Sequence, residues 1–478
     1  MNLNKLTITE AINGLKEKKF SSEELVEDCF KRIKDIDEKV RAFVTVCENE
    51  ALEQVKRIGG NVPNAEKPLL GIPFAVKDNF CTKDIKTTAS AKVLENYVPV
   101  YDATVVKKLK EAGAIIIGKT NMDAWAHGSS TETSDFFTTR NPWNLNRLPG
   151  GSSGGSAAAI AADMTIGAIG SETAGSIRQP AAWCGVVGMK PTYGRVSRYG
   201  VIAMASSTDS PGPITKTVED SALILGILAG KDENDATTSP LLVPNYLREI
   251  RVMGEMGGIS WIKGIKIGVP KEYFIEGIEE EVKNNTLKAI DVFKKLGAEI
   301  VEISLIDPKY SVAVYTILQR SEVSSNLARY DGIRFGNNRT FFGQEAKRRI
   351  MLGTYTLSAG YFDKYYLKAQ KVRTLICQDF EKAFQKVDII LGPTSPCTAL
   401  PVGITKGASM FGELQDILVE ASSIAGLPGI NLCSGFSQDG LPTGIQIIGQ
   451  NFSEELILKT SFAYEQATEW SKRKPNLE

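Results

Sequence analysis

The sequence has only one histidine, His127, in 478 residues. Its seven cysteines are scattered, odd in number and free of any C-x-x-C pair. Structural zinc sites and disulfide frameworks both need clustered or evenly paired ligands, so we expect neither a metal nor a disulfide in this chain. Unpaired cysteines of this kind are typical of a reducing, cytoplasmic environment.

Long hydrophobic runs and an excess of either charge are also missing. No stretch approaches the ~20 apolar residues of a membrane span, and the opening MNLNKLTITEAINGLKEKKF has no apolar signal core. Lys+Arg and Asp+Glu both number 56, so the formal net charge is zero. We therefore expect a soluble cytoplasmic protein without a membrane partner and without a broad basic surface for nucleic acid.

The pattern of apolar residues predicts an α/β fold. Residues 5–60 have helical spacing, and Ser21 with Glu24 forms a capping box before the second apolar run. From Pro68 onward, short apolar runs bounded by glycine alternate with amphipathic segments. This alternation is typical of buried strands layered against helices.

Residues 113–120 match the phosphate-loop pattern G-x-x-x-x-G-K-[ST] to the letter. In a true phosphate loop, the backbone curls after its strand so that successive N–H groups face the phosphate. Here the middle of the motif is Ala-Ile-Ile-Ile, which is itself strand-like. The pattern therefore favours a buried strand ending in a turn over an ATP site.

Residues 151–155 match the nucleophile elbow G-x-S-x-G, with Ser153 at its centre. Enzymes with that elbow place the triad histidine after the serine along the chain. His127 comes before the serine, so this mechanism is disfavoured. We expect His127 to be a packed or hydrogen-bonded residue, near a pocket because it begins the polar stretch HGSSTETS.

A lysine can replace histidine as the base if burial makes it neutral. Lys77 ends the apolar run GIPFAVK, and a shift of its pKa from ~10.4 toward ~7 corresponds to about 4 kcal/mol, within the range of buried lysines. The alternative is an ordinary strand-end lysine paired with Asp78. The residues alone leave both interpretations open.

The stretch GGSSGGSAAAIAADMTIGAIGSETAGSIRQPAAWCGVVGMKPTYGRVS resembles the amidase signature, and GIPFAVKDN resembles the lysine segment of that family. The resemblance implies a Ser–cis-Ser–Lys triad. Ser176 is then the nucleophile, Ser152 the bridging serine and Lys77 the base. The implied oxyanion hole consists of backbone N–H groups of Thr173, Ala174, Gly175 and Ser176.

The same resemblance implies the amidase-signature fold, in which a large mixed β-sheet is covered by helices on both faces. We expect a single domain over residues 1–478. Its expected parts are a helical N-terminal arm (1–60), a signature core with the catalytic residues (66–220), a surface excursion (230–262) and a C-terminal α/β part with substrate-binding residues (263–478).

Further segments, among them TNMDAWAHGSSTETS and SIAGLPGINL, resemble the glutaminase subunits of bacterial and archaeal tRNA-dependent amidotransferases. This resemblance implies hydrolysis of glutamine or asparagine, with ammonia passed to a partner that converts Glu-tRNA(Gln), or Asp-tRNA(Asn), to its amide. It implies a heterotrimer with subunits B and C, contact with aminoacyl-tRNA mainly through the partner, and no cofactor in this chain, since the partner uses ATP and magnesium.

Glutamine is a zwitterion, so its pocket needs a cation and an anion. The resemblance assigns Arg349 to the α-carboxylate and Asp416 to the α-ammonium, and Thr173 lies where it can touch the substrate amide. The alternative for Arg349 is a solvated helix face shared with Lys347 and Arg348. The alternative function is a stand-alone amidase for small aliphatic or aryl amides, which would need neither charge.

Ser176→Ala is expected to abolish amide hydrolysis while the fold persists, because it removes the nucleophile. Lys77→Ala should be nearly as severe, whereas His127→Ala should retain activity. Ammonia release by the purified variants, with circular dichroism as the check on folding, measures this. A His127→Ala variant as inactive as Ser176→Ala would contradict the histidine-free mechanism.

Overall fold

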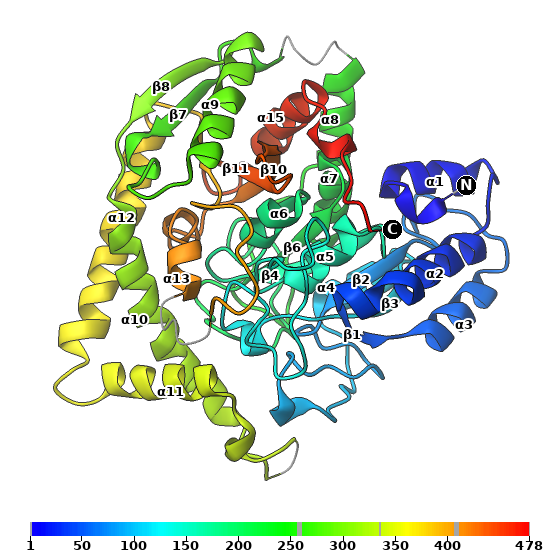
Figure 1. Cartoon of the computed structure of the whole chain (residues 1–478), viewed down its shortest axis with the longest axis horizontal. Helices are drawn as coiled ribbons and strands as arrows, with labels where there is room; N and C mark the ends of the chain where they lie inside the picture. Colours follow the sequence, from blue (N-terminus) through cyan, green and yellow to red (C-terminus); the bar gives the residue numbers. More distant parts are fainter. Residues whose placement is uncertain (1, 256–260, 334–335, 406–410, 478) are drawn as a thin grey trace.

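The computed structural model describes residues 2–255, 261–333, 336–405 and 411–477 (Figure 1). Within these residues the strands are β1 (Phe43–Val46), β2 (Pro73–Lys77), β3 (Ile115–Thr120), β4 (Gly167–Glu172), β5 (Val187–Lys190), β6 (Ser210–Thr215), β7 (Lys266–Pro270), β8 (Glu299–Ile303), β9 (Ile389–Pro393), β10 (Gly429–Phe436) and β11 (Pro442–Ile448). The helices are α1 (Ile8–Lys16), α2 (Ser22–Val40), α3 (Glu48–Ile58), α4 (Thr104–Glu111), α5 (Gly154–Ala161), α6 (Arg178–Cys184), α7 (Val218–Leu228), α8 (Tyr246–Glu255), α9 (Glu280–Lys295), α10 (Pro308–Asn326), α11 (Gln344–Leu357), α12 (Lys368–Phe384), α13 (Phe411–Gln415), α14 (Glu420–Ile424) and α15 (Glu454–Gln466).

All the strands of the described residues belong to one mixed sheet of eleven, in the order β1-β3-β2-β4-β6-β5-β10-β11-β9-β7-β8. Strands β3, β2 and β4 are parallel to one another, as are β8, β7 and β9. The centre, from β4 through β6, β5, β10 and β11 to β9, pairs antiparallel. The sheet therefore joins two α/β segments that lie far apart in the sequence.

Strand β2 shows how helices cover both faces of this sheet. Phe74 and Val76 pack into one core together with residues of α4 and α7, while Ala75 between them packs into another core with residues of α2 and α5. Successive side chains of a strand point to opposite faces, so one fully buried strand supplies both layers. The expected mixed sheet with helices on both faces is confirmed.

The N-terminal arm follows the prediction with one exception. Ser21 and Glu24 form the expected capping box at the start of α2, and Thr7 with Glu10 forms a second one at α1. Helices alone were expected over residues 5–60, but β1 lies between α2 and α3 and pairs with β3. A strand of four residues is too short to leave a clear alternating pattern.

The region rich in Gly, Ser and Ala contains β4, β5 and β6 as well as α5 and α6. Every residue of α5 is buried, so its small side chains serve close packing. Residues 230–262, expected to be a surface excursion, include α8, whose Tyr246 and Ile250 are buried. Residues 256–260 of that excursion lie outside the described part of the chain.

None of the helices in the described ranges has the length and apolar character that a membrane span requires.

The phosphate-loop-like residues form a buried strand, as the sequence favoured. Residues 115–120 of the motif are β3, and Lys119 at its end has no exposed surface. The Lys119 ammonium donates to the carbonyl of Phe80 at 2.7 Å and to the hydroxyl of Thr87 at 2.7 Å, and lies 3.7 Å from the Asp78 carboxylate. Lys119 is thus a buried structural residue near the end of β3.

Lys119→Ala should destabilise the protein by about 3–5 kcal/mol, because it leaves Asp78 as a buried carboxylate without its counter-charge. The matched control is Lys107→Ala on the exposed face of α4, which should change stability by less than about 1 kcal/mol. Denaturant unfolding of both variants measures the difference. Nucleotide binding should be undetectable before and after the change, and loss of measurable ATP binding in Lys119→Ala would contradict the structural role.

Candidate active site

Lys77 stands at the carboxyl end of β2, beside the parallel strand β4. Its side chain has no exposed surface. The amine lies 2.8 Å from the hydroxyl of Ser152, 3.0 Å from the hydroxyl of Ser171 and 3.0 Å from the carbonyl oxygen of Ser171. The surface-lysine alternative is therefore excluded, and Asp78 instead accepts hydrogen bonds from Thr88 and the N–H of Ser90.

The surroundings of Lys77 favour a neutral amine. Burial lowers the pKa of Lys77 to about 7, although the carboxylates of Asp123, Asp209 and Glu172 act to raise it. Burial likewise raises the pKa of Asp209 to about 6. A neutral amine can accept a proton from a hydroxyl that donates to it, which an ammonium cannot do.

Ser152 occupies a tight turn before α5, and the Gly151–Ser152 peptide bond is cis. The N–H of Gly151 in this turn donates to the side chain of Gln179 at 3.0 Å. Asp123, whose carboxylate accepts the N–H of Ser130 at 3.0 Å, packs so closely that it leaves no room for a side chain at Gly151. The next residue, Ser153, donates its N–H to the carbonyl of Ser176 at 3.1 Å.

The structure thus joins Lys77 to Ser152 directly and brings the Ser152 turn against Ser176. No hydrogen bond links the hydroxyls of Ser152 and Ser176 in the described residues, so this last step of the implied relay stays a prediction.

Glu172 and Arg178 hold the loop that carries Ser176. Glu172 accepts the N–H groups of Ile177 and Arg178, each at 3.0 Å, and pairs with the Arg178 guanidinium at 2.6 Å. Both side chains are completely buried. The N–H groups of Thr173, Ala174, Gly175 and Ser176 have no acceptor among the described residues, which leaves them available to an oxyanion.

The hydroxyl of Thr173 donates to Asp209 at 2.7 Å. Because this hydroxyl is already engaged, Thr173 can contact a substrate more readily through its backbone than through its side chain.

Asp416 lies directly against this loop. A side-chain carbon at Gly175 would come within 2.4 Å of the Asp416 carboxylate. One oxygen of that carboxylate accepts a hydrogen bond from Ser129 at 2.7 Å, and the other has no partner among the described residues. Burial raises the pKa of Asp416 well above its usual value. Asp416 is therefore placed against the residue that precedes the predicted nucleophile, with a free oxygen for a donor.

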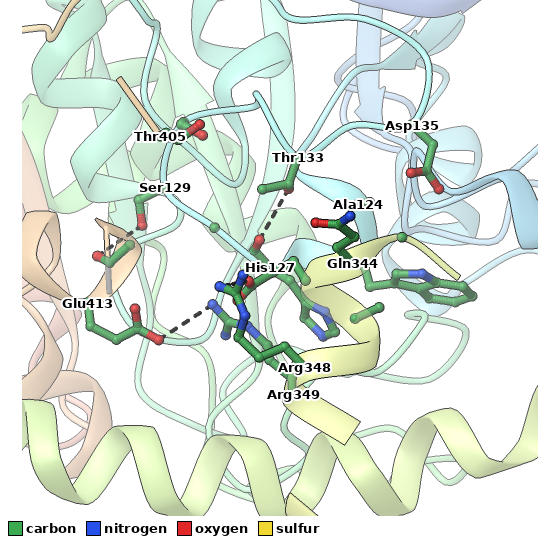
Figure 2. A pocket seen from close by; sticks show the side chains of 17 residues that line it. Ala124, His127, Ser129, Thr133, Asp135, Gln344, Arg348, Arg349, Thr405 and Glu413 are labelled. Carbon is green, nitrogen blue, oxygen red and sulfur yellow. Dashed lines mark hydrogen bonds and ion pairs between the residues drawn. The ribbon is translucent and has the colours of Figure 1, made fainter. Parts of the chain in front are cut away.

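A cavity of about 280 Å³ has Ser129 in its wall (Figure 2), and Ser129 donates to Asp416. Its walls come from residues 124–135, from the start of α11, and from Thr405, Gly412 and Glu413. Arg349 and Ser129 line it, whereas Lys77, Ser152, Ser176 and Asp416 do not. Ser129 connects the cavity with the predicted catalytic residues, because it lines the cavity and donates a hydrogen bond to Asp416.

Arg349 belongs to a compact group of charges at this cavity. It contacts Glu345 at 2.7 Å and Glu413 at 3.5 Å, and Glu413 also pairs with Arg320 at 2.8 Å. Arg348 shares Glu345 at 2.9 Å. The Nη1 atom of Arg349 is buried without a partner in the described chain, so this guanidinium keeps one donor for a bound molecule.

The helix-face alternative for Arg349 is wrong, since only 4% of its side chain is exposed.

His127 also lines the cavity and is buried. It is packed, as expected, but neither ring nitrogen has a hydrogen-bond partner among the described residues. The sequence interpretation did not identify Ser129 and Glu413 as site residues. Ser129 stands in the polar stretch HGSSTETS that the sequence had already placed near a pocket, and Glu413 lies three residues before Asp416.

No group of side chains suited to a metal ion occurs in the described ranges.

The chain belongs to the amidase family, whose model, Amidase, matches residues 24–458. It is therefore an amidase-family hydrolase, and the resemblance predicted from the signature is confirmed.

Among its relatives are the A subunits of two bacterial glutamyl-tRNA(Gln) amidotransferases. The chain is 49% identical to that of Thermodesulfovibrio yellowstonii and 50% identical to that of Carboxydothermus hydrogenoformans, with 100% of each chain covered. The solved structure of the corresponding A subunit from Thermotoga maritima is 43% identical and superimposes with a TM-score of 0.82, covering 100% of this chain and 96% of that one. A peptide amidase from Stenotrophomonas maltophilia is 27% identical, with a TM-score of 0.83 and coverage of 99% and 98%.

The pKa of Lys77 leads to a pH dependence. If neutral Lys77 is the base, kcat/KM for amide hydrolysis should fall about tenfold per pH unit below 7 and level off above it, because protonation removes the acceptor. Lys77→Arg, which stays charged, should lose about 10²–10⁴-fold in kcat at every pH. A pH–rate profile of ammonia release measures both, and a profile flat from about pH 5 to 9 in the unaltered protein would exclude Lys77 as the base.

Proposed function

We propose that this chain is the glutaminase subunit of a tRNA-dependent amidotransferase. The observation that carries the proposal is the combination of an amidase-family fold with a charged pocket that Ser129 and Asp416 connect to the predicted nucleophile loop. The relatives of matching length are named as the A subunit of glutamyl-tRNA(Gln) amidotransferase, which supports the same conclusion.

In the proposed reaction, the hydroxyl oxygen of Ser176 attacks the carboxamide carbon of glutamine. Its proton passes to Ser152, and the Ser152 proton passes to neutral Lys77. The negative charge that develops on the substrate oxygen is stabilised by the free N–H groups of the Ala174–Gly175–Ser176 loop. The charge and the protons balance, because Lys77 becomes an ammonium as the oxyanion forms.

Collapse of this intermediate breaks the C–N bond. The leaving nitrogen takes a proton from Ser152, which recovers one from Lys77, and ammonia departs from a glutamyl ester on Ser176. A water molecule then attacks the ester by the same relay and regenerates the serine with release of glutamate. Ser152 and Lys77 therefore act first as base and then as acid in both acylation and deacylation, while Ser176 is first the nucleophile and then the leaving group.

The pocket supports a zwitterionic substrate over a neutral amide. Arg349 supplies the cation for the α-carboxylate, and Asp416 supplies an unpaired carboxylate oxygen for the α-ammonium. With a neutral aliphatic or aryl amide bound, Nη1 of Arg349 and one carboxylate oxygen of Asp416 would stay buried without a partner, at a cost of about 1–3 kcal/mol or more per group. The stand-alone amidase is therefore the second candidate.

The amidotransferase also requires partners. We propose a heterotrimer with subunits B and C, in which the partner binds aminoacyl-tRNA, activates its carboxylate with ATP and magnesium, and receives the ammonia. The acceptor would be Glu-tRNA(Gln), Asp-tRNA(Asn) or both. The balance of 56 basic and 56 acidic residues is consistent with a chain that contacts tRNA little. Since aminoacyl-tRNA is made in the cytoplasm, we place the protein there.

Ammonia release from L-glutamine and from propionamide tests the proposal. With the isolated chain, release from both should be low, and partner subunits with ATP, magnesium and acceptor tRNA should raise release from glutamine at least about tenfold. Asp416→Asn in the assembled enzyme should raise KM for glutamine, because the α-ammonium loses its counter-charge. Full activity of the isolated chain on propionamide would establish the stand-alone amidase instead.

A further inference from the structure

His127 is a buried polar side chain for which the fold itself supplies no partner. Only 1% of its surface is exposed, and both ring nitrogens lack a hydrogen-bond partner in the described part of the chain. Buried polar groups are almost always hydrogen-bonded in native proteins, so an unpaired imidazole calls for an explanation. His127 lines the cavity that also contains Arg349 and Ser129, where a bound molecule can reach it.

A second unpaired group lies on the same wall of the cavity. His127 and Arg349 are neighbours there (Figure 2), and the Nη1 atom of Arg349 is also buried without a partner among the described residues. The other nitrogens of that guanidinium contact Glu345 and Glu413. One guanidinium nitrogen and one imidazole therefore remain free at the same place.

The charges around His127 determine what it can bind. Burial lowers the pKa of His127 well below 6.5, and the nearby guanidiniums of Arg349 and Arg320 lower it further. The ring is therefore neutral, with one N–H donor and one bare nitrogen. Two carboxylates, of Glu345 and Glu413, pair with these guanidiniums, and Arg348 adds a third guanidinium to the group. Three positive charges against two negative ones favour an anion over a cation at this place.

We infer that His127 and Arg349 together bind the α-carboxylate of the substrate, with one ring N–H of His127 donating to one carboxylate oxygen and Nη1 of Arg349 donating to the other. This inference rests on the proposed function, because it concerns the substrate of the same site. It makes the single histidine a specificity-determining residue that takes no part in proton transfer to the nucleophile.

The arrangement gives the site a means of rejecting neutral amides. A substrate with a carboxylate satisfies both buried donors, and a substrate without one leaves them unpaired. A hydrogen bond to a charged acceptor corresponds to about a ten- to hundredfold difference in binding. His127 should therefore affect KM for carboxylate-bearing substrates and leave kcat nearly unchanged.

Two truncated substrates isolate this interaction. 4-Carbamoylbutanoate keeps the carboxylate of glutamine and lacks the ammonium, and 4-aminobutanamide keeps the ammonium and lacks the carboxylate. His127→Leu should raise KM about ten- to hundredfold for L-glutamine and for 4-carbamoylbutanoate, with kcat within about threefold. KM for 4-aminobutanamide should not change. An equal rise for all three substrates, or no rise for any, would overturn the inference.

Matched variants separate hydrogen bonding from packing. His127→Gln and His127→Asn each place an amide N–H near one of the two ring nitrogens, and one of them should restore most of the affinity lost in His127→Leu. Gln344→Leu removes an exposed polar side chain from the same cavity and should leave KM for glutamine unaltered. Loss of affinity in Gln344→Leu as large as in His127→Leu would contradict a specific contact.

A direct measurement uses the fact that the chain has one histidine. In the full-length Ser176→Ala variant labelled with ¹⁵N-histidine, the ring nitrogen signals should shift on addition of L-glutamine or 4-carbamoylbutanoate and stay in place with 4-aminobutanamide. Calorimetry on the same samples records binding. Glutamine that binds without moving these signals would overturn the role of His127, whereas failure of glutamine to bind at all would instead count against the proposed function.

Discussion

The amine of Lys77 is buried away from solvent, so the protein must supply its hydrogen-bond partners. The geometry of the site depends on where those partners lie. Burial disfavours the charged form of the amine and lowers the pKa of Lys77 to about 7. The nitrogen lies within hydrogen-bond distance of the hydroxyl oxygens of Ser152 and Ser171. These partners come from the turn before α5 and from strand β4, so the hydrogen bonds of one amine fix both elements relative to β2. A solvated lysine at the same sequence position would impose no such constraint.

The loop that carries Ser176 is held in a comparable way by the buried pair of Glu172 and Arg178. Such a pair adds little net stability, because desolvation offsets its attraction, but it fixes geometry when every donor and acceptor is used. Arg178 also donates to Ser422 at 3.0 Å and to Gln446 at 2.7 Å. The signature loop is therefore built into the C-terminal half of the sheet.

The features of the fold and site that depend on local sequence patterns could be predicted from the sequence. The features that depend on contacts between distant residues could not. The strand ending at Lys77 and the capping box of Ser21 depend on local patterns, and both are confirmed. Strand β1 is too short to show a pattern. The role of Ser129 depends on a contact 287 positions away in sequence, and that of Glu413 on contacts 64 and 93 positions away, which local spacing does not encode. Role assignments for Ser152 and Ser176 stay predictions, although the structure places Ser152 beside Lys77 and the Ser152 turn against Ser176.

The hydrogen bond between Arg178 and Gln446 spans 268 residues of sequence. A ribosome adding roughly 5–20 residues per second needs about 13–54 s to travel that distance. Throughout this interval the nascent chain already contains Lys77, Ser152 and Ser176, yet it lacks the strand that completes the arginine's set of acceptors. The contacts that fix the loop of the predicted nucleophile are therefore completed only as synthesis nears its end.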